Sequence, residues 1–289
     1  EMNRPEWRKK NDVKTKYRFI GTHYCKHEDT FIAEHEEVVV SSSSFTYEEF
    51  FEIRDLNFMF FAVFNLNFQK WFFQFIRNLG VKPSSFFASF MKPDRNKMWP
   101  KGYLNFLDDL HRAIKGELHD TREEMVAKAK EIFEANGNDV GDASPINLSY
   151  GARLSYLEKD WVQPVLMHFL EQFTGSNLTN ENRVLASSLI KLAEYERVNL
   201  KQIDEKEPLN IAFDIINWKE NKFKEPLSNL KMSSSKPVKF SVDKTQASVI
   251  NSFKEKFSSY KDKDFYYQAM EIIKPRKFLL HTLTYGDNQ

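Results

Sequence analysis

The stretch from Ser44 to Gly80 constrains the fold most, because it is very apolar and carries clear signals for both ends of a helix. Thr46 and Glu49 have the spacing of a capping box, in which each side chain satisfies the free backbone N–H of the other residue. The helix is expected to end at Gly80, which readily takes the left-handed C′ conformation, and Pro83 prevents it from resuming soon afterwards. The sequence therefore predicts helical structure over most of residues 44–80.

The apolar residues of this stretch would face every side of a helix, which predicts burial among other elements. A membrane span is the competing interpretation, and it requires roughly 20 mostly apolar residues. Amide and lysine side chains interrupt the run: Asn57, Asn65, Asn67, Gln69, Lys70 and Gln74. Polar groups without partners are costly in lipid. We therefore expect a buried helix, broken near Asn65–Asn67, and no membrane span.

The composition limits the possible classes of protein. A chain of 289 residues holds one large domain or two smaller ones, and its 41% hydrophobic content is enough for a sizeable core. With only 9 glycines, it is unlike the α/β enzymes that use glycine-rich turns to hold phosphates. The net charge of +1 gives no reason to expect nucleic acid or an anionic membrane as a partner. The single cysteine, Cys25, excludes an internal disulfide and indicates a reducing compartment, so a cytoplasmic location is expected.

The remaining pattern predicts a mainly α (α+β) fold, with an N-terminal β-hairpin followed by a multi-helix domain and a minor extra strand. The hairpin strands are expected at Tyr17–Cys25 and Phe31–Val40, which are rich in β-prone residues. Leu209–Trp218 fits either a strand or a buried helix turn, because periodicity cannot decide over so few residues. Ser233–Pro237 is interpreted as a linker before a strand at Val238–Val242.

The expected domain bounds, a polar loop and a proline indicate where the chain divides. Residues 1–44 are expected to form the tail of a preceding domain together with the hairpin, and residues 45–289 a helical domain. A loop rich in Gly, Asp, Ser and Pro gives a possible internal boundary near residues 138–147. Ser149–Phe173 has a helical pattern, and Pro164 within it should kink or divide the helix.

The residue types that bind metals come together at His23, Cys25 and His27. Residues two apart in a strand point to the same face, so these three side chains would project together, with His35 expected opposite them on the partner strand. Thiolate and imidazole suit zinc or copper. The spacing matches no established zinc motif and a second cysteine is missing, so an exposed hairpin face is the favoured interpretation.

Arg54 lies in a very apolar part of the expected helix, and a buried arginine usually needs an acidic partner. Glu34, Glu36 or Glu37 of the preceding strand could supply it. We interpret Arg54 as a contact between domains first and a substrate contact second. The sequence contains no GxGxxG, P-loop, HExxH or GxSxG motif, so no catalytic residue is predicted.

Residues 15–65 carry an ordered set of motifs. The set begins with T-K-x-R at Thr15–Arg18, a hairpin, and the acidic residues followed by valines of Glu34–Val40. It continues with a serine run and a helix that opens with T-x-E-E and has Arg54 after that opening. This segment, about the first quarter of the chain, resembles the region that follows the barrel in cobalamin-binding radical-SAM proteins. Glu1–Pro5 resembles the chain leaving the last barrel strands, and Glu1 ahead of Met2 indicates a processed chain or a piece of a longer protein.

The resemblance implies a non-catalytic C-terminal region that packs on the barrel of a cobalamin-dependent radical-SAM enzyme and helps to enclose its substrate. The iron–sulfur cluster, S-adenosylmethionine and cobalamin would belong to the missing barrel and cobalamin domain of the same polypeptide, since one cysteine cannot hold such a cluster. This chain would hold no cofactor and be inactive alone. Arg18, Glu37 and Arg54, which lie in the matching motifs, are expected to make domain or substrate contacts.

Two alternatives remain open from the residues alone. The chain could be a stand-alone helical binding module, with an aromatic groove for a peptide or an apolar ligand. It could also be a metalloprotein that uses the His23–His27 cluster. A fragment should expose an apolar patch where the barrel docks, whereas a binding module should contain a concave pocket.

Overall fold

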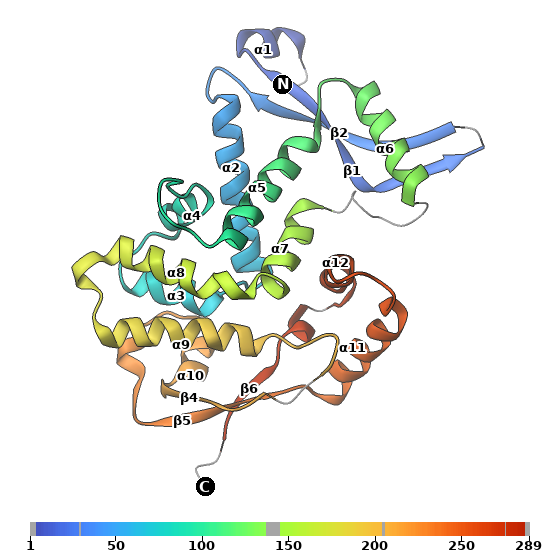
Figure 1. Cartoon of the computed structure of the whole chain (residues 1–289). Helices are drawn as coiled ribbons and strands as arrows, with labels where there is room; N and C mark the ends of the chain where they lie inside the picture. The colour runs from blue at the N-terminus through green and yellow to red at the C-terminus, as the bar shows by residue number, and fades with distance from the viewer. Residues whose placement is uncertain (1–3, 29, 137–144, 204–205, 275, 287–289) are drawn as a thin grey trace.

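The computed structural model describes residues 4–28, 30–136, 145–203, 206–274 and 276–286, with the backbone alone for residues 21–24. The fold is mainly helical with two small antiparallel sheets, which confirms the predicted α+β class. Figure 1 shows the hairpin at one end of the molecule, the helices in the middle and the second sheet at the opposite end.

The α-helices lie throughout the described part of the chain. They are α1 (Pro5–Lys10), α2 (Tyr47–Phe60), α3 (Lys70–Asn78), α4 (Pro83–Met91), α5 (Lys101–Gly116), α6 (Arg122–Asn136), α7 (Ile146–Tyr156), α8 (Lys159–Thr174), α9 (Asn180–Glu196), α10 (Ile215–Glu220), α11 (Lys244–Phe257) and α12 (Asp262–Ile272). In this part of the chain, no helix has the length and apolar character needed to cross a membrane.

The predicted hairpin is confirmed as β1 (Lys14–His27) and β2 (Thr30–Ser41), which pair antiparallel. A third strand, β3 (Leu118–His119), pairs with the other edge of β1, giving the order β2-β1-β3. Helix α6 packs on the hairpin as well, and the rings of Phe31 and Phe133 lie 5.5 Å apart. The hairpin is therefore joined to residues 118–136, while the expected boundary at 138–147 falls mostly outside the described residues.

The second sheet has the order β4-β5-β6, formed by β4 (Leu209–Phe213), β5 (Lys231–Ser241) and β6 (Thr282–Tyr285). The ambiguous segment 209–218 contains both expected elements, since β4 is followed directly by α10. The prediction of a linker at 233–237 was wrong, because these residues lie within β5 and Lys236 and Pro237 pair with β4. Side chains 233–235 of β5 are exposed, which explains their polar composition.

The start of the central helix follows the predicted capping box. The Thr46 hydroxyl accepts from the Glu49 backbone N–H at 3.1 Å, and the Glu49 carboxylate accepts from the Thr46 N–H at 2.7 Å. Helix α2 continues into the π-helical turn η1 (Phe61–Asn65). The expected break follows at residues 66–69, where Asn67 and Gln69 have φ values of 56° and 48°.

Helix α3 ends as predicted. Gly80 has a φ of 79°, its N–H donates to the Arg77 carbonyl, and the Val81 N–H donates to the Ile76 carbonyl. This is the Schellman arrangement, which satisfies two carbonyls at the end of a helix. The six residues Trp71–Ile76 are all buried, so α3 is surrounded as expected.

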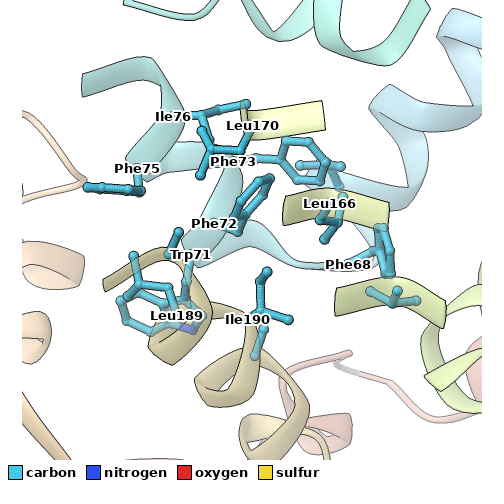
Figure 2. Packing of buried hydrophobic residues seen from close by; sticks show 14 of the residues in the cluster. Phe68, Trp71, Phe72, Phe73, Phe75, Ile76, Leu166, Leu170, Leu189 and Ile190 are labelled. Atoms are coloured by element: carbon cyan, nitrogen blue, oxygen red, sulfur yellow. The ribbon is translucent and has the colours of Figure 1, made fainter. Parts of the chain in front are cut away.

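Aromatic rings around α3 form the centre of the main core. Figure 2 shows Phe72 and Phe73 among side chains of α8 and α9. The Phe73 ring meets Phe86 and Phe87 of α4 edge-on, at centroid distances of 5.4 and 5.1 Å. Edge-to-face rings add a modest attraction to the apolar area that they bury. A second buried cluster joins α7, α11 and α12.

The helical region 149–173 divides earlier than the sequence predicts. The break lies at residues 157–158 between α7 and α8, and Pro164 lies inside α8. Of the two expected outcomes, a kink or a division of the helix at Pro164, the division was therefore wrong. The turn carries instead a polar clamp around Arg153, described below.

Candidate functional site

The predicted arginines Arg18 and Arg54 meet at one glutamate, Glu117. Glu117 Oε1 accepts from Arg18 Nη1 at 3.0 Å and also forms an ion pair with Arg54. Arg18 Nε in turn donates to Glu36 at 2.6 Å. The prediction that Glu34, Glu36 or Glu37 pairs with Arg54 was wrong, because the pairing of β3 with β1 brings Glu117, at the end of α5, between the two arginines.

This cluster is only partly accessible to water, with side-chain exposures of 16% for Arg54, 20% for Glu117 and 26% for Arg18. Burial lowers the pKa of Arg54, and the neighbouring positive charge of Arg18 lowers it further. The negative charge of Glu117 opposes both effects, but the pKa remains below its ordinary value. For Arg18, burial acts in the same direction, but the attraction and hydrogen bonds of Glu117 and Glu36 outweigh it and raise its pKa. Glu117 therefore holds two cations together and fastens the hairpin to α2 and α5.

Glu37 makes a separate contact. It accepts hydrogen bonds from Arg8 at 2.6 and 2.8 Å, and from the Thr15 hydroxyl at 2.7 Å. The bonds from Arg8 and then Thr15 lower the pKa of Glu37 to about 2, against the smaller opposing effect of burial. Glu37 thus binds α1 to the hairpin.

The residues proposed for a metal site lie at the far half of the hairpin. Cys25 and His27 are exposed, and the side chain of His23 lies outside the described residues. The expectation that His35 lies opposite them was wrong, because a register shift between Phe19 and Tyr24 pairs His35 with Phe19 and Cys25 with Ile32. Among the described residues, no three His, Cys, Asp or Glu side chains are grouped to hold a metal ion.

An exposed row of apolar side chains runs along α2 and η1. Ile53, Phe60 and Phe64 are exposed by 56%, 42% and 40%, and we call this row the α2 stripe. The Phe60 and Phe64 rings are stacked, with centroids 5.8 Å apart. The prediction that other elements surround the whole of 44–80 was therefore wrong for this face of α2.

A pocket of about 370 Å³ lies where α7, α8, α9 and α12 meet the turn before α3. We call it the α7–α9 pocket. Four of its lining residues are polar or charged and at least nine-tenths buried: Gln69, Ser155, Tyr156 and Arg197. Lysines and Glu194 also line it, beside a smaller apolar wall that includes Phe68 and Val162. This lining is mixed, and differs from the aromatic groove expected of a peptide-binding module.

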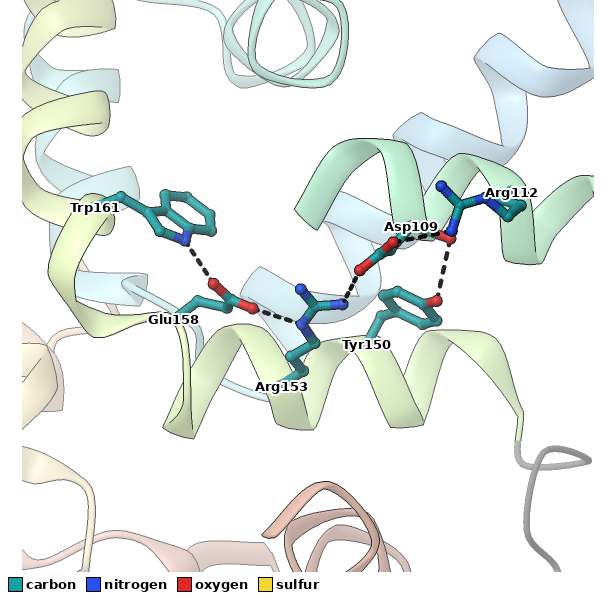
Figure 3. A network of polar contacts seen from close by, with 6 residues as sticks. All are labelled: Asp109, Arg112, Tyr150, Arg153, Glu158 and Trp161. Atoms are coloured by element: carbon teal, nitrogen blue, oxygen red, sulfur yellow. Dashed lines mark hydrogen bonds and ion pairs between the residues drawn. The ribbon is translucent and has the colours of Figure 1, made fainter. Parts of the chain in front are cut away.

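The turn beside this pocket is held by the clamp in Figure 3. Arg153 donates to Asp109 of α5 at 2.9 Å and to Glu158 at 2.5 Å, and the Trp161 indole donates to Glu158 at 2.6 Å. These bonds connect α5, α7 and the start of α8. They fix the end of α7, which carries Ser155 and Tyr156, relative to Lys159.

Glu194 is the acidic residue among the described residues that line this pocket, and it lies near the end of α9. Burial raises the pKa of Glu194, while the positive charges of Lys159 and Lys191 oppose the shift. Burial also raises the pKa of Tyr156, and this effect is larger than the opposing effect of the neighbouring Arg197. The Tyr156 hydroxyl therefore stays protonated and able to donate a hydrogen bond. Such shifted groups in a pocket are typical of binding and catalytic sites.

The sequence did not point to Glu117 or to the pocket residues. The pocket takes single residues from segments as far apart as Gln69 and Tyr266, so no local motif marks it. No protein-family model matches the chain, and no curated protein matches its sequence significantly.

Proposed function

We propose that this chain is the C-terminal, non-catalytic region of a cobalamin-dependent radical-SAM enzyme. It would pack on the barrel of the same polypeptide and help to enclose the substrate. The α2 stripe is the observation that supports this most directly, because it lies within Thr15–Asn65, the segment that resembles the family. The proposal includes a cytoplasmic location, in keeping with the single cysteine.

The chemistry of the α2 stripe suits a protein partner. Large exposed apolar side chains that line up on one face mark contact surfaces more often than isolated ones do. Aromatic side chains in particular are enriched in the buried centres of interfaces. Ile53, Phe60 and Phe64 recur along α2 and η1 on the same side, so a flat partner surface can cover all three at once.

The ion-pair cluster beside α2 gives this surface a fixed position relative to the hairpin. Glu117 joins Arg18 of β1 to Arg54 of α2, which is the residue after Ile53. The hairpin and the α2 stripe would therefore dock as one body. Closing the open side of a barrel in this way would exclude water from a reactive radical, as reactive sites generally require.

The first experiment is to sequence the source gene upstream of the codon for Glu1. The proposal expects an in-frame CxxxCxxC motif, since three cysteines of that kind hold the cluster in the family, with room for a barrel before Glu1. A start codon or a stop codon immediately upstream would refute the proposal, because no catalytic domain would then belong to this chain.

A second experiment examines the α2 stripe itself. Amide hydrogen exchange of residues 53–64 would be compared between the 289-residue chain and the full-length polypeptide. Slower exchange in the full-length protein is expected, and the double variant F60S/F64S should reverse it. V184S is the matched control, because Val184 is 67% exposed on α9 and lies outside the stripe. Equal exchange in both proteins would contradict docking at this face.

A stand-alone binding module remains the second candidate function. The stacked pair Phe60–Phe64, with the exposed side chains of Asn57 and Asn65 beside it, offers both apolar contact and amide hydrogen bonds to a peptide. An upstream stop codon together with unprotected residues 53–64 would favour this function over the first.

A further inference from the structure

The geometry points to a second site, the α7–α9 pocket, which binds a small phosphorylated polyol such as a sugar phosphate. This inference does not depend on the proposed function, because it rests on a different surface of the chain. Four features of the described residues carry it: buried polar atoms without partners among them, a buried arginine with no carboxylate partner among them, acceptors that line the same pocket as donors, and the size of the pocket.

Three buried side chains around the pocket have polar atoms without a hydrogen-bond partner among the described residues. They are Gln69 Oε1, the Ser155 hydroxyl and the Tyr156 hydroxyl. Buried polar groups are hydrogen-bonded in the great majority of folded proteins, and each one left unpaired costs free energy. Their grouping around a single pocket indicates that a bound polar molecule supplies the partners.

Arg197 extends the same argument to charge. It is 9% exposed, its Nη2 donates to the Leu66 carbonyl at 2.6 Å, and its guanidinium lies 5.3 Å from the centre of the Tyr156 ring. Within the described residues, its guanidinium contacts are this carbonyl and this ring, and no ion pair joins it to a carboxylate. A buried charge is costly unless it is paired. An anion in the pocket would meet the guanidinium of Arg197 together with Lys159 at the start of α8.

The donors and acceptors together define the ligand. Arg197, Lys159, Ser155 and Tyr156 offer four donor groups, which matches a phosphate with its three free oxygens better than a carboxylate with two. Gln69 Oε1 and the half-buried Glu194 are acceptors, and they require hydroxyl or amine donors on the ligand. A phosphate attached to a polyol satisfies both sets.

The volume sets an upper limit on this ligand. Small-molecule pockets run from roughly 300 to 1,000 Å³, so a pocket of about 370 Å³ holds a compact molecule. A pentose phosphate is of this size, whereas a dinucleotide is too large. The clamp of Arg153, Asp109 and Glu158 keeps the walls in place without a ligand, which lowers the ordering cost of binding.

The test is calorimetric titration of the 289-residue chain with ribose 5-phosphate, ribose and inorganic phosphate. The expected order of affinity is ribose 5-phosphate first, with the two fragments each at least tenfold weaker. K159M should weaken ribose 5-phosphate about tenfold, and Y156F about fivefold, since each removes one hydrogen-bond donor from the site. K254M is the matched control, because Lys254 is an exposed lysine of α11 outside the pocket lining.

Both variants are chosen to preserve folding, which circular dichroism would verify. K159M changes an exposed residue, and Y156F removes only a hydroxyl that has no partner. Three results would overturn the inference: no binding of ribose 5-phosphate, equal binding of inorganic phosphate, or equal losses in K159M and K254M. The first result would indicate that ordered water fills the pocket and satisfies its buried groups.

Discussion

Replacing Glu117 by glutamine removes the one negative charge that Arg18 and Arg54 share. The shape of the side chain is almost unchanged, so the effect reports the charge rather than the packing. Among the described residues, Arg54 forms an ion pair with Glu117. Without that carboxylate, Arg54 would lie beside the positive charge of Arg18 with no such pair. We therefore expect E117Q to loosen the contact between the hairpin and α2.

The size of the effect follows from how buried the cluster is. Exposed ion pairs contribute about 0–1 kcal/mol, and removing one partner of a fully buried pair costs about 3–5 kcal/mol. With exposures of 16–26%, the cluster lies between these limits, and we expect a loss of about 2 kcal/mol. For a chain of 289 residues, that corresponds to a melting temperature lower by about 3 °C.

Urea and thermal unfolding of E117Q would measure this loss, and E52Q is the matched control. Glu52 pairs with one cation, Lys92, at 2.7 Å, and both side chains are more than half exposed. E52Q should therefore cost about 1 kcal/mol or less. The double variant R54M/E117Q should be more stable than the separate losses predict, because it also removes the unpaired cation.

Equal losses in E117Q and E52Q would refute the reasoning, since burial would then have no influence on the pair. A coupling energy near zero between the changes at Arg54 and Glu117 would refute it as well. Either result would mean that the hairpin is held by its backbone pairing with β3 and its packing on α6, without help from the charges.

Three further changes examine single contacts. T46A should lower the free energy of unfolding by about 1 kcal/mol, measured by urea denaturation, because it removes the cap of α2. Glu37 has a folded pKa of about 2, below its ordinary value of 4.5, so its stabilisation is fully present above pH 4.5 and is lost as the pH falls towards 2. E37Q should therefore flatten the stability curve over that range in acid titrations followed by circular dichroism. G151A should lower the stability of the protein although alanine favours helices, because the new Cβ would lie 2.3 Å from Leu66 Cδ1. G116A should not lower it, because its Cβ would meet nothing within 4 Å. Thermal unfolding of the two variants would measure the difference.

The parts of the fold that depend on residues close together in the sequence were predictable from the sequence. The Thr46–Glu49 cap, the left-handed Gly80 and the two hairpin strands each follow from a few residues in sequence, and all were confirmed. The extent of β5 was not predictable, because its polar first half is a strand only through its pairing with β4 and the exposure of its side chains.

The candidate site was likewise predictable from the sequence only in part. The sequence correctly marked Arg54 as a residue that needs an acidic partner, but that partner, Glu117, lies 63 residues away and reaches it through the two-residue strand β3. Nothing in the local pattern around Leu118 predicts a strand. The α7–α9 pocket is assembled from residues of separate helices, so its chemistry exists only in the folded chain.

The break between η1 and α3 explains why α2 exposes apolar side chains while α3 is buried. At 1.5 Å per residue, one straight helix over 47–80 would be about 50 Å long. That is close to the whole width expected of a compact chain of this size, whose radius of gyration is about 19 Å. Such a helix could not be surrounded along its full length.

The turn at 66–69 resolves this conflict without glycine or proline. The Leu66 carbonyl accepts from Arg197, the Phe68 N–H donates to the Ala62 carbonyl, and Asn67 and Gln69 take left-handed backbone conformations. Left-handed backbone outside glycine costs free energy and persists only where surrounding contacts fix it. The contact from Arg197 therefore helps to turn α3 into the core, and α2 is left along the outside with one apolar face that the described part of the chain does not cover.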